Sequence, residues 1–294
     1  MNTVSQTTRA TLIVVLTGLL WGFYWWPVRT LESLGLTGAW GTVGISIAGL
    51  AVLIPVGWRK RHVLRHADRI GTLSVFVGGA AFALYSIGFI YGRVALVILL
   101  FFLTPVWSTL IARVVLGRST PLMRMMAIGV GLAGLTVMLS AQGNLPVPRN
   151  LGEWMGLASG LFWAIASTGI RERSELGAPE AAFVFVAGAA IMAAVLAPLL
   201  APLPQSVEVM AAIPVAAVTG VIWWGISMGL LMWATARLDP ARTGILLMSE
   251  VLVGAASAAV LASEHLSALE MTGGALVLLA GLLEVWPERT GRVA

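Results

Sequence analysis

Ten apolar stretches, separated by short polar breaks, run the length of this 294-residue chain. A helix that rises ~1.5 Å per residue needs about 20 apolar residues to cross the ~30 Å hydrocarbon core of a bilayer. The predicted spans are 10–28, 38–58, 71–91, 94–115, 122–141, 153–170, 180–200, 210–236, 240–262 and 268–286. Only 11% of the residues are charged, against about a quarter in a soluble domain. The sequence therefore predicts an all-α, polytopic membrane protein with ten transmembrane helices.

One short pattern occurs twice in the chain. Its members are Gly18, Leu19, Trp21, Arg29, Leu34 and Gly35, which recur 142 positions later as Gly160, Leu161, Trp163, Arg171, Leu176 and Gly177. Because each half holds an odd number of predicted spans, the two copies cross the membrane in opposite senses, as in many secondary transporters. We therefore expect two inverted five-helix repeats, residues 1–141 and 153–294, joined by a linker at 142–152 and enclosing a central cavity.

The positive charges predict the orientation. Of the 18 Lys and Arg residues, only Arg29, Arg93 and Arg149 fall in connections on the side opposite the N-terminus. Since Lys and Arg concentrate in cytoplasmic loops, both termini are expected in the cytoplasm and the linker in the periplasm.

Several of these features together resemble the drug/metabolite transporter superfamily, in its EamA-type ten-span branch. They are the two five-span halves, the Trp inside the first span of each half, the Gly-rich closing helix, and the fourth-to-fifth connections Leu116-Gly117-Arg118 and Ala262-Ser263-Glu264. The resemblance covers the whole chain and implies a multi-pass transporter of the bacterial inner membrane. The chain departs from the family at Arg118, where the motif usually has Glu, as it does at Glu264.

Three motifs within that branch resemble the bacterial YddG-type exporters of aromatic amino acids: Phe-Val-Gly-Gly at 76–79, Phe-Leu-Thr-Pro at 102–105 and Gly-Leu-Phe-Trp at 160–163. The resemblance implies amino-acid export. Those exporters place Tyr and Trp just before the fourth-span proline, where this chain has Phe102 and Thr104, so strict aromatic specificity is not implied.

Two residues stand out within the spans without reference to any family. Glu250 lies deep in the ninth span, where a carboxylate is costly and usually faces a water-filled cavity or a partner. It is expected to line the transport path or to bind a proton, and a structural bond to a neighbouring helix is the alternative. Pro105 should kink the fourth span and free a carbonyl, which fits a gating hinge and a packing kink equally well.

The aromatic residues fall into two groups. Trp25, Trp26, Trp40, Trp58, Trp154, Trp233 and Trp286 lie near span ends and are expected to anchor the protein at the membrane interfaces. Trp21 and Trp163 lie inside their spans, and helical spacing puts Phe82 with Tyr85, and Trp224 with Ser227, on shared faces. The predicted substrate-binding residues are Trp21, Gly79, Phe82, Tyr85, Phe102, Thr104, Trp163, Trp224, Ser227 and Met248. Ordinary core packing is the alternative for each aromatic.

The sequence offers little for other functions. It has no Gly-x-x-x-x-Gly-Lys-Ser/Thr loop for ATP, no cysteine, and no intramembrane Ser, His and Asp set, so neither an enzyme nor a cofactor is expected. His62 and His66 lie in the most basic loop, which would repel a metal ion. The arginines are scattered rather than gathered on one face, which argues against nucleic acid. The Gly-rich fifth and tenth spans fit either a tightly packed scaffold or a homodimer face.

We therefore expect a secondary transporter that exports small amphiphilic metabolites, with neutral or aromatic amino acids as the first candidates, by alternating access. Spans 1, 3, 4, 6, 8 and 9 are expected to line its cavity. Its partners would be the substrate, the lipid bilayer and, if Glu250 titrates, protons. A broad-specificity drug or metabolite exporter and a non-transporting membrane scaffold remain the alternatives.

Overall fold

The computed structural model describes residues 2–117, 122–141, 143, 146–235, 237–238 and 240–285, and all regular secondary structure in these ranges is helical. The helices of the first half are α1 (Asn2–Trp21), α2 (Trp25–Ser33), α3 (Trp40–Arg59), α4 (Arg61–His66), α5 (Arg69–Tyr91), α6 (Val94–Phe101), α7 (Thr104–Val114) and α8 (Leu122–Ser140). Those of the second half are α9 (Leu151–Arg173), α10 (Ala178–Leu200), α11 (Ser206–Thr219), the π-helix η1 (Gly220–Ser227), α12 (Met228–Thr235), α13 (Pro240–Leu261) and α14 (Ala268–Val285).

Each stretch predicted as a span is helical, apart from short breaks, over its described residues. Six of these helical runs are long and apolar enough to cross a membrane, namely 6–33, 40–59, 69–91, 94–114, 178–200 and 206–235. Shorter apolar helices cover 125–140, 245–261 and 268–283. The helix α9 falls in neither group and carries Glu153 in its first turn and Arg171 and Arg173 in its last. The described chain is therefore that of a multi-pass membrane protein, whereas the count of ten spans stays a prediction.

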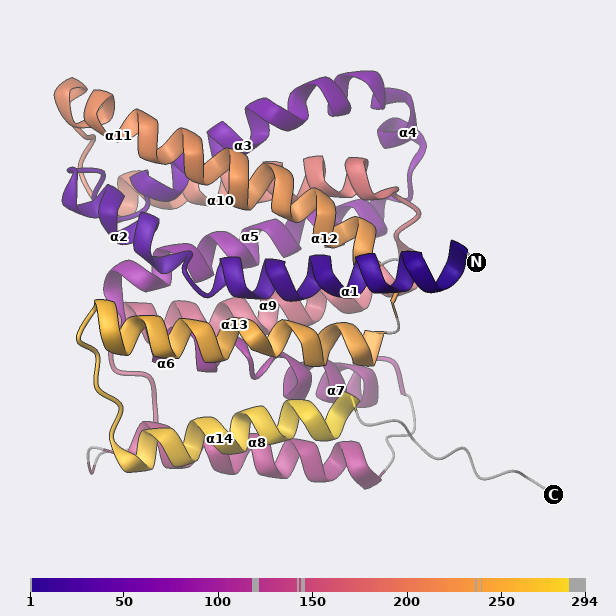
Figure 1. Ribbon diagram of the computed structural model, residues 1–294, viewed down its shortest axis with the longest axis vertical. Coiled ribbons are helices and arrows are strands. Elements are labelled where there is room, and N and C mark those ends of the chain that lie inside the picture. The colour runs from indigo at the N-terminus through magenta and orange to yellow at the C-terminus, as the bar shows by residue number, and fades with distance from the viewer. Residues whose placement is uncertain are drawn as a thin grey trace.

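The long helices run side by side along one direction, so their ends gather at two faces of the bundle (Figure 1). We call "N side" the face where α1 begins and α7, α9 and α12 end. We call "far side" the face where α2, α5 and α10 end and α6 and α14 begin (Figure 1). The extreme C-terminal residues, 286–294, lie outside the described ranges and include the predicted anchor Trp286.

The first helical run is interrupted at residues 22–24, between α1 and α2, where the chain turns instead of continuing the helix. Side chains of other helices add hydrogen-bond partners to carbonyls of this turn. Leu20 O accepts from the backbone N–H of Phe23 at 3.1 Å and also from Trp223 Nε1 at 3.0 Å, and the Ser257 hydroxyl lies 3.1 Å from Gly22 O. Because an unpaired carbonyl in hydrocarbon costs several kcal/mol, such breaks persist only where tertiary partners exist.

A second interruption separates α6 from α7 at Phe102 and Leu103, just before Pro105. Proline has no N–H, so Pro105 cannot donate to the carbonyl of Phe101 four residues earlier. The Thr104 hydroxyl donates to that carbonyl instead, at 2.7 Å, and lies 3.2 Å from Gly160 O of α9. The kink expected from Pro105 is therefore a complete break in the fourth run, stabilised by its neighbour Thr104.

Glycine allows two pairs of helices to touch backbone to backbone. A Cβ on Gly79 of α5 would collide with the carbonyl of Phe185 in α10, and one on Gly188 of α10 would collide with that of Phe76. Gly134 of α8 and Gly273 of α14 approach each other in the same way. The Gly-rich fifth and tenth predicted spans thus pack on one another, as the scaffold interpretation predicts, and the homodimer alternative stays a prediction.

The structure corrects one of the predicted anchors. Trp25 is buried, with 3% of its surface exposed, and its indole donates to Ser257 Oγ at 2.9 Å. The prediction that it lies at the membrane interface was wrong, because the break at residues 22–24 turns it toward α13. Trp26, Trp58 and Trp154, by contrast, are more than half exposed, as interfacial residues would be.

Candidate substrate cavity

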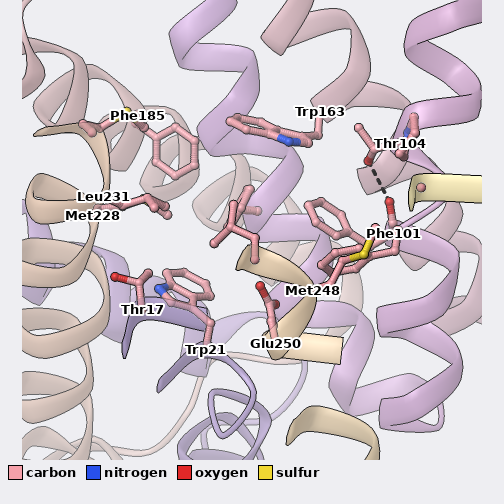
Figure 2. Close-up of a pocket in the computed structure, with 16 residues that line it drawn as sticks. Thr17, Trp21, Phe101, Thr104, Trp163, Phe185, Met228, Leu231, Met248 and Glu250 are labelled. Atoms are coloured by element: carbon pink, nitrogen blue, oxygen red, sulfur yellow. Dashed lines mark hydrogen bonds between the residues drawn. The ribbon is translucent and has the colours of Figure 1, made fainter. Parts of the chain in front are cut away.

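A cavity of about 190 Å³ lies between the two halves of the chain, with its wall drawn from α1, α5, α7, α9, α10, α12, α13 and α14 and from the ends of α6 (Figure 2). Its lining residues are Thr17, Trp21, Phe82, Phe101, Phe102, Thr104, Pro105, Trp163, Phe185, Met228, Leu231, Met232, Leu247, Met248, Glu250 and Gly281. The break between α6 and α7 opens directly onto it. Aromatic rings, methionines and leucines make up most of this wall, so the cavity suits a ligand with a large apolar part.

Phe82 lies at the centre of the aromatic part of the wall. Its ring meets Trp21, Phe101, Trp163 and Phe185 edge to face, with ring centroids 5.1–5.5 Å apart. Edge-to-face contacts at such distances are favourable and hold the rings in fixed orientations. The wall that a ligand meets is therefore preformed by five rings from five helices.

Glu250 supplies the only charged group on the described wall. Its side chain is 7% exposed, and its Oε1 accepts a hydrogen bond from the Tyr85 hydroxyl at 2.8 Å. Figure 2 shows Glu250 beside Trp21, across the cavity from Trp163. No Lys, Arg or His is among the described lining residues, so the carboxylate faces the cavity without a cation from the protein.

A buried polar network closes the cavity toward the far side. The indole of Trp21 donates to Ser227 Oγ at 2.8 Å, and that of Trp224 donates to the Tyr24 hydroxyl at 2.9 Å. The Tyr24 hydroxyl in turn bonds Ser86 Oγ at 2.9 Å. Tyr24 and Trp224 have 0% of their surface exposed. The lining residues toward the N side, such as Leu231 and Leu247, are instead partly exposed.

The structure brings eight of the twelve predicted site residues together on the cavity wall: Trp21, Phe82, Phe102, Thr104, Pro105, Trp163, Met248 and Glu250. The other four lie behind it. Gly79 packs on the α10 backbone, Tyr85 holds Glu250, and Trp224 and Ser227 belong to the network that closes the far side. Helical spacing put Trp224 and Ser227 on one face, but the π-helix η1, which adds a residue to its turn, changes where that face points.

Sequence reasoning missed half of the wall. The missed residues are Thr17, Phe101, Phe185, Met228, Leu231, Met232, Leu247 and Gly281. Phe185 and Gly281 come from the seventh and tenth predicted spans, which were not expected to line the cavity. Thr17 and Leu247 lie one helical turn or less from Trp21 and Glu250, so a spacing argument could have found them. Nothing in the local sequence distinguishes Phe185 from a core phenylalanine.

The described helices are thus those of a multi-pass membrane protein, and they enclose a cavity whose described wall carries one carboxylate. Residues 8–140 match the EamA-like transporter family. This match implies a membrane transporter of small metabolites rather than an enzyme.

Two further comparisons concern the whole chain. A solved crystal structure is similar over 94% of this chain and 98% of its own, with a TM-score of 0.58 and 20% sequence identity. That likeness speaks for the fold alone, and it extends through the second half, beyond the residues of the family match. A search among curated proteins finds no significant match.

Proposed function

We propose that this protein is a secondary transporter that exports small amphiphilic metabolites bearing an amino group, with neutral or aromatic amino acids as the first candidates. The observation that carries the proposal is the position of Glu250, the one charged group among the described residues of a mostly aromatic and aliphatic wall. An ionisable residue that faces a cavity inside a membrane marks a substrate or ion pathway by default.

The chemistry of the wall favours a cationic head and an apolar body. The carboxylate of Glu250 would pair with the substrate ammonium, and the ring of Trp21, which lies beside Glu250 (Figure 2), would attract it further by cation–π interaction. The apolar part would pack against Phe82, Phe101 and the methionines. A substrate carboxylate would find no cation on the described wall, where the Thr17 hydroxyl is a neutral donor and the Thr104 hydroxyl already donates to Phe101 O. The amino group is therefore the part of the substrate that this cavity selects.

Helix packing supports the two inverted repeats on which alternating access would depend. If α1–α2 corresponds to α9, α5 to the α11–α12 run, and α6–α7 to α13, then each contact between halves should occur twice. The helix α5 packs on α9, and α12 packs on α1. Likewise α6 and α7 pack on α9, and α13 packs on α1. In the same scheme α3 corresponds to α10 and α8 to α14, so the contact within each of these pairs occurs once, and both contacts are present. The repeat boundaries 1–141 and 153–294 agree with this scheme.

Transport would alternate access between the two sides of the bundle. The N side would face the cytoplasm of a bacterial inner membrane, as the distribution of Lys and Arg predicts. Pro105 and Thr104 lie where the fourth run is already broken, so this break would act as a hinge with little further loss of hydrogen bonds. Protons would compete with the substrate ammonium for the Glu250 carboxylate, which would couple export to a pH gradient.

Broad specificity is the second candidate. Met228, Met232 and Met248 all line the cavity. Methionine is flexible and polarisable and is over-used at surfaces that bind many different ligands. A drug or metabolite exporter would exploit this adaptability.

Flux through proteoliposomes tests the proposal. The purified protein is reconstituted, and uptake of labelled tryptophan, leucine, tryptamine and indole-3-acetate is measured with and without a pH gradient. Compounds with an amino group should be transported, and indole-3-acetate should not. Transport of all four compounds, or competition by unrelated molecules, would favour the broad-specificity exporter. Absence of flux for every compound would contradict the transporter assignment for these classes.

The variant Glu250→Gln removes the proposed counter-ion with little change in shape. Truncating one partner of a buried charge pair costs about 2–5 kcal/mol, so affinity for amino compounds should fall about 30- to 4,000-fold. Glu175→Gln is the matched control, because Glu175 is exposed and away from the cavity wall. Unchanged affinity and pH response in Glu250→Gln would remove both substrate pairing and proton coupling at this residue.

A further inference from the structure

Arg29 connects α2, the end of α5 and the α13–α14 connection at the far side. Arg29 of α2 donates to the carbonyls of Phe89 and Gly92, at the end of α5, at 3.0 and 2.9 Å. Its guanidinium also forms an ion pair with Glu264 of the α13–α14 connection, at 2.9 Å. The pair thus joins the first predicted repeat to the second at the face where the cavity is closed.

Glu264 has further partners besides Arg29. Its carboxylate accepts hydrogen bonds from the backbone N–H groups of Val94 and Ala95, at 3.1 and 3.4 Å, where α6 begins. A carboxylate at a helix N-terminus is also favoured by the helix dipole. The preceding residue, Ser263, has φ +52°, a left-handed conformation that non-glycine residues rarely adopt. The α13–α14 connection is therefore strained at Ser263, the residue that precedes Glu264 and helps to place it at the start of α6.

A second ion pair lies beside the first. Arg93, immediately before α6, pairs with Glu270 of α14 at 2.6 Å and donates to the carbonyl of His265 at 2.6 Å. Both acids are well buried, with Glu264 10% and Glu270 5% exposed at the side chain. The far side is thus closed by two partly buried ion pairs between the halves, in addition to the polar network around Tyr24 and Trp224.

The sequence repeat gives each member of the Arg29–Glu264 pair a match in the other half. The sequence repeat matches Arg29 with Arg171, which is exposed in the last turn of α9. It matches Glu264 with Arg118, which lies outside the described ranges and contributes only its identity here. The backbone supports this match, because Gly117 has φ +62° at the position that corresponds to Ser263. The two residues paired on the far side are thus matched in the sequence by Arg171 and Arg118, two like charges that cannot form an ion pair with each other.

The N side does hold another ion pair between the halves. Lys60, after α3, lies 3.3 Å from Glu180 of α10. This pair joins helices that pack along much of their length, and its lysine side chain is 52% exposed, so its contribution is small.

We propose that Arg29 and Glu264 form a latch, which holds the far side closed at rest and which the sequence repeat does not duplicate, because the residues matched with them are both arginines. This inference rests on the alternating access of the proposed function. Because a latch stabilises only the state in which it is formed, it shifts the equilibrium between the two states by its own interaction free energy. The resting protein would therefore present its cavity to the N side and open the far side only when Arg29 and Glu264 separate.

Cysteine labelling tests the latch, because the chain has no native cysteine. Ser86→Cys reports opening of the far side, since Ser86 is fully buried beside Tyr24, and Thr17→Cys reports the N side of the cavity. Reaction with a hydrophilic maleimide is measured in detergent micelles, without substrate. Breaking the latch by Glu264→Gln should raise the labelling rate at residue 86 by about 5- to 150-fold.

Two other variants keep the result interpretable. Arg29→Gln removes the same pair from the other helix, so the two single variants and the double variant should give similar labelling rates. Glu208→Gln is the control, because Glu208 also lies at the far side but bonds within the first turn of α11. Folding of each variant is checked by its elution as a monodisperse species.

The reverse experiment builds the missing contact. Arg118→Glu gives the position matched with Glu264 its carboxylate, opposite in charge to the matched Arg171, and should slow labelling at residue 17, whereas Arg118→Gln should not. Unchanged labelling at residue 86 in folded Glu264→Gln and Arg29→Gln proteins would overturn the latch. Since this assay uses no substrate, failure of the latch leaves transport measured in proteoliposomes unaffected, and absence of transport leaves the labelling result standing.

Discussion

The break before Pro105 allows a quantitative prediction about stability. Thr104→Val replaces the hydroxyl by a methyl group of nearly the same shape and removes the donor that lies 2.7 Å from the carbonyl of Phe101. Phe101 is buried, with 6% of its surface exposed, so water does not take the place of the hydroxyl. A buried acceptor left without a donor costs about 1–3 kcal/mol. The free energy of unfolding should fall by this amount.

A second substitution should offset the loss. Pro105→Ala supplies a backbone N–H that can donate to Phe101 O, the acceptor four residues earlier in a continuous helix. Alone, it should change stability by less than about 1 kcal/mol, because Thr104 already satisfies that carbonyl. Combined with Thr104→Val, it should recover most of the loss, so the two substitutions should show a coupling energy of about 1–2 kcal/mol.

The assay is unfolding in detergent micelles titrated with SDS and followed by tryptophan fluorescence, with Thr104→Ser as a control that keeps the hydroxyl. Equal stability of Thr104→Val and the unmodified protein would refute the claim that this hydroxyl satisfies the carbonyl freed by Pro105. Simple additivity in the double variant would show that the two residues do not share one acceptor. The double variant should also transport more slowly if the break is a hinge.

Two further predictions use matched variants within the chain. Trp163→Ala should lower transport at least tenfold, because it removes a ring from the cavity wall and the contact of that ring with Phe82. Trp58→Ala is the control, because Trp58 is 70% exposed, and it should change transport less than twofold. Equal losses of transport in the two variants would contradict the assignment of the cavity. Gly79→Ala should destabilise the protein by about 1–3 kcal/mol, because the added methyl group meets the carbonyl of Phe185. Gly129→Ala is the control, because the space around Gly129 is open, and it should be neutral or stabilising by up to about 1 kcal/mol. Unfolding in SDS measures both glycine variants, and destabilisation of similar size in the two would show that helix crossing is not what requires Gly79.

The sequence predicted the helical architecture well because bilayer thickness imposes a length and a polarity on each segment, and both can be counted. The stretches predicted as spans coincide with helices or helical runs, and the arginines of the connections gather mostly on one side. It also predicted that Glu250 faces a cavity or a partner. The structure shows both, since the carboxylate lines the cavity and bonds Tyr85. The cost of a buried charge does not depend on where the neighbouring helices lie, so this inference needed no tertiary information.

Other parts of the site depend on how the helices are rotated, which their own sequences leave open. Spacing along a regular helix put Trp224 and Ser227 toward the cavity, but the π-helix turns them into the network that closes its far side. Trp25 looks like an interfacial anchor by position, yet the turn after α1 buries it against Ser257. Phe185 reaches the wall only because α10 lies close enough to α5 for their backbones to touch.

By itself, then, the sequence determined which segments are apolar helices and that a carboxylate lies among them, because both follow from transfer free energies that add along the chain. Only the tertiary structure decided which side chains share the cavity, which freed carbonyls are paired, and that Arg29 reaches Glu264. Those contacts join residues that lie up to 235 positions apart. They depend on distances between helices rather than on any local preference.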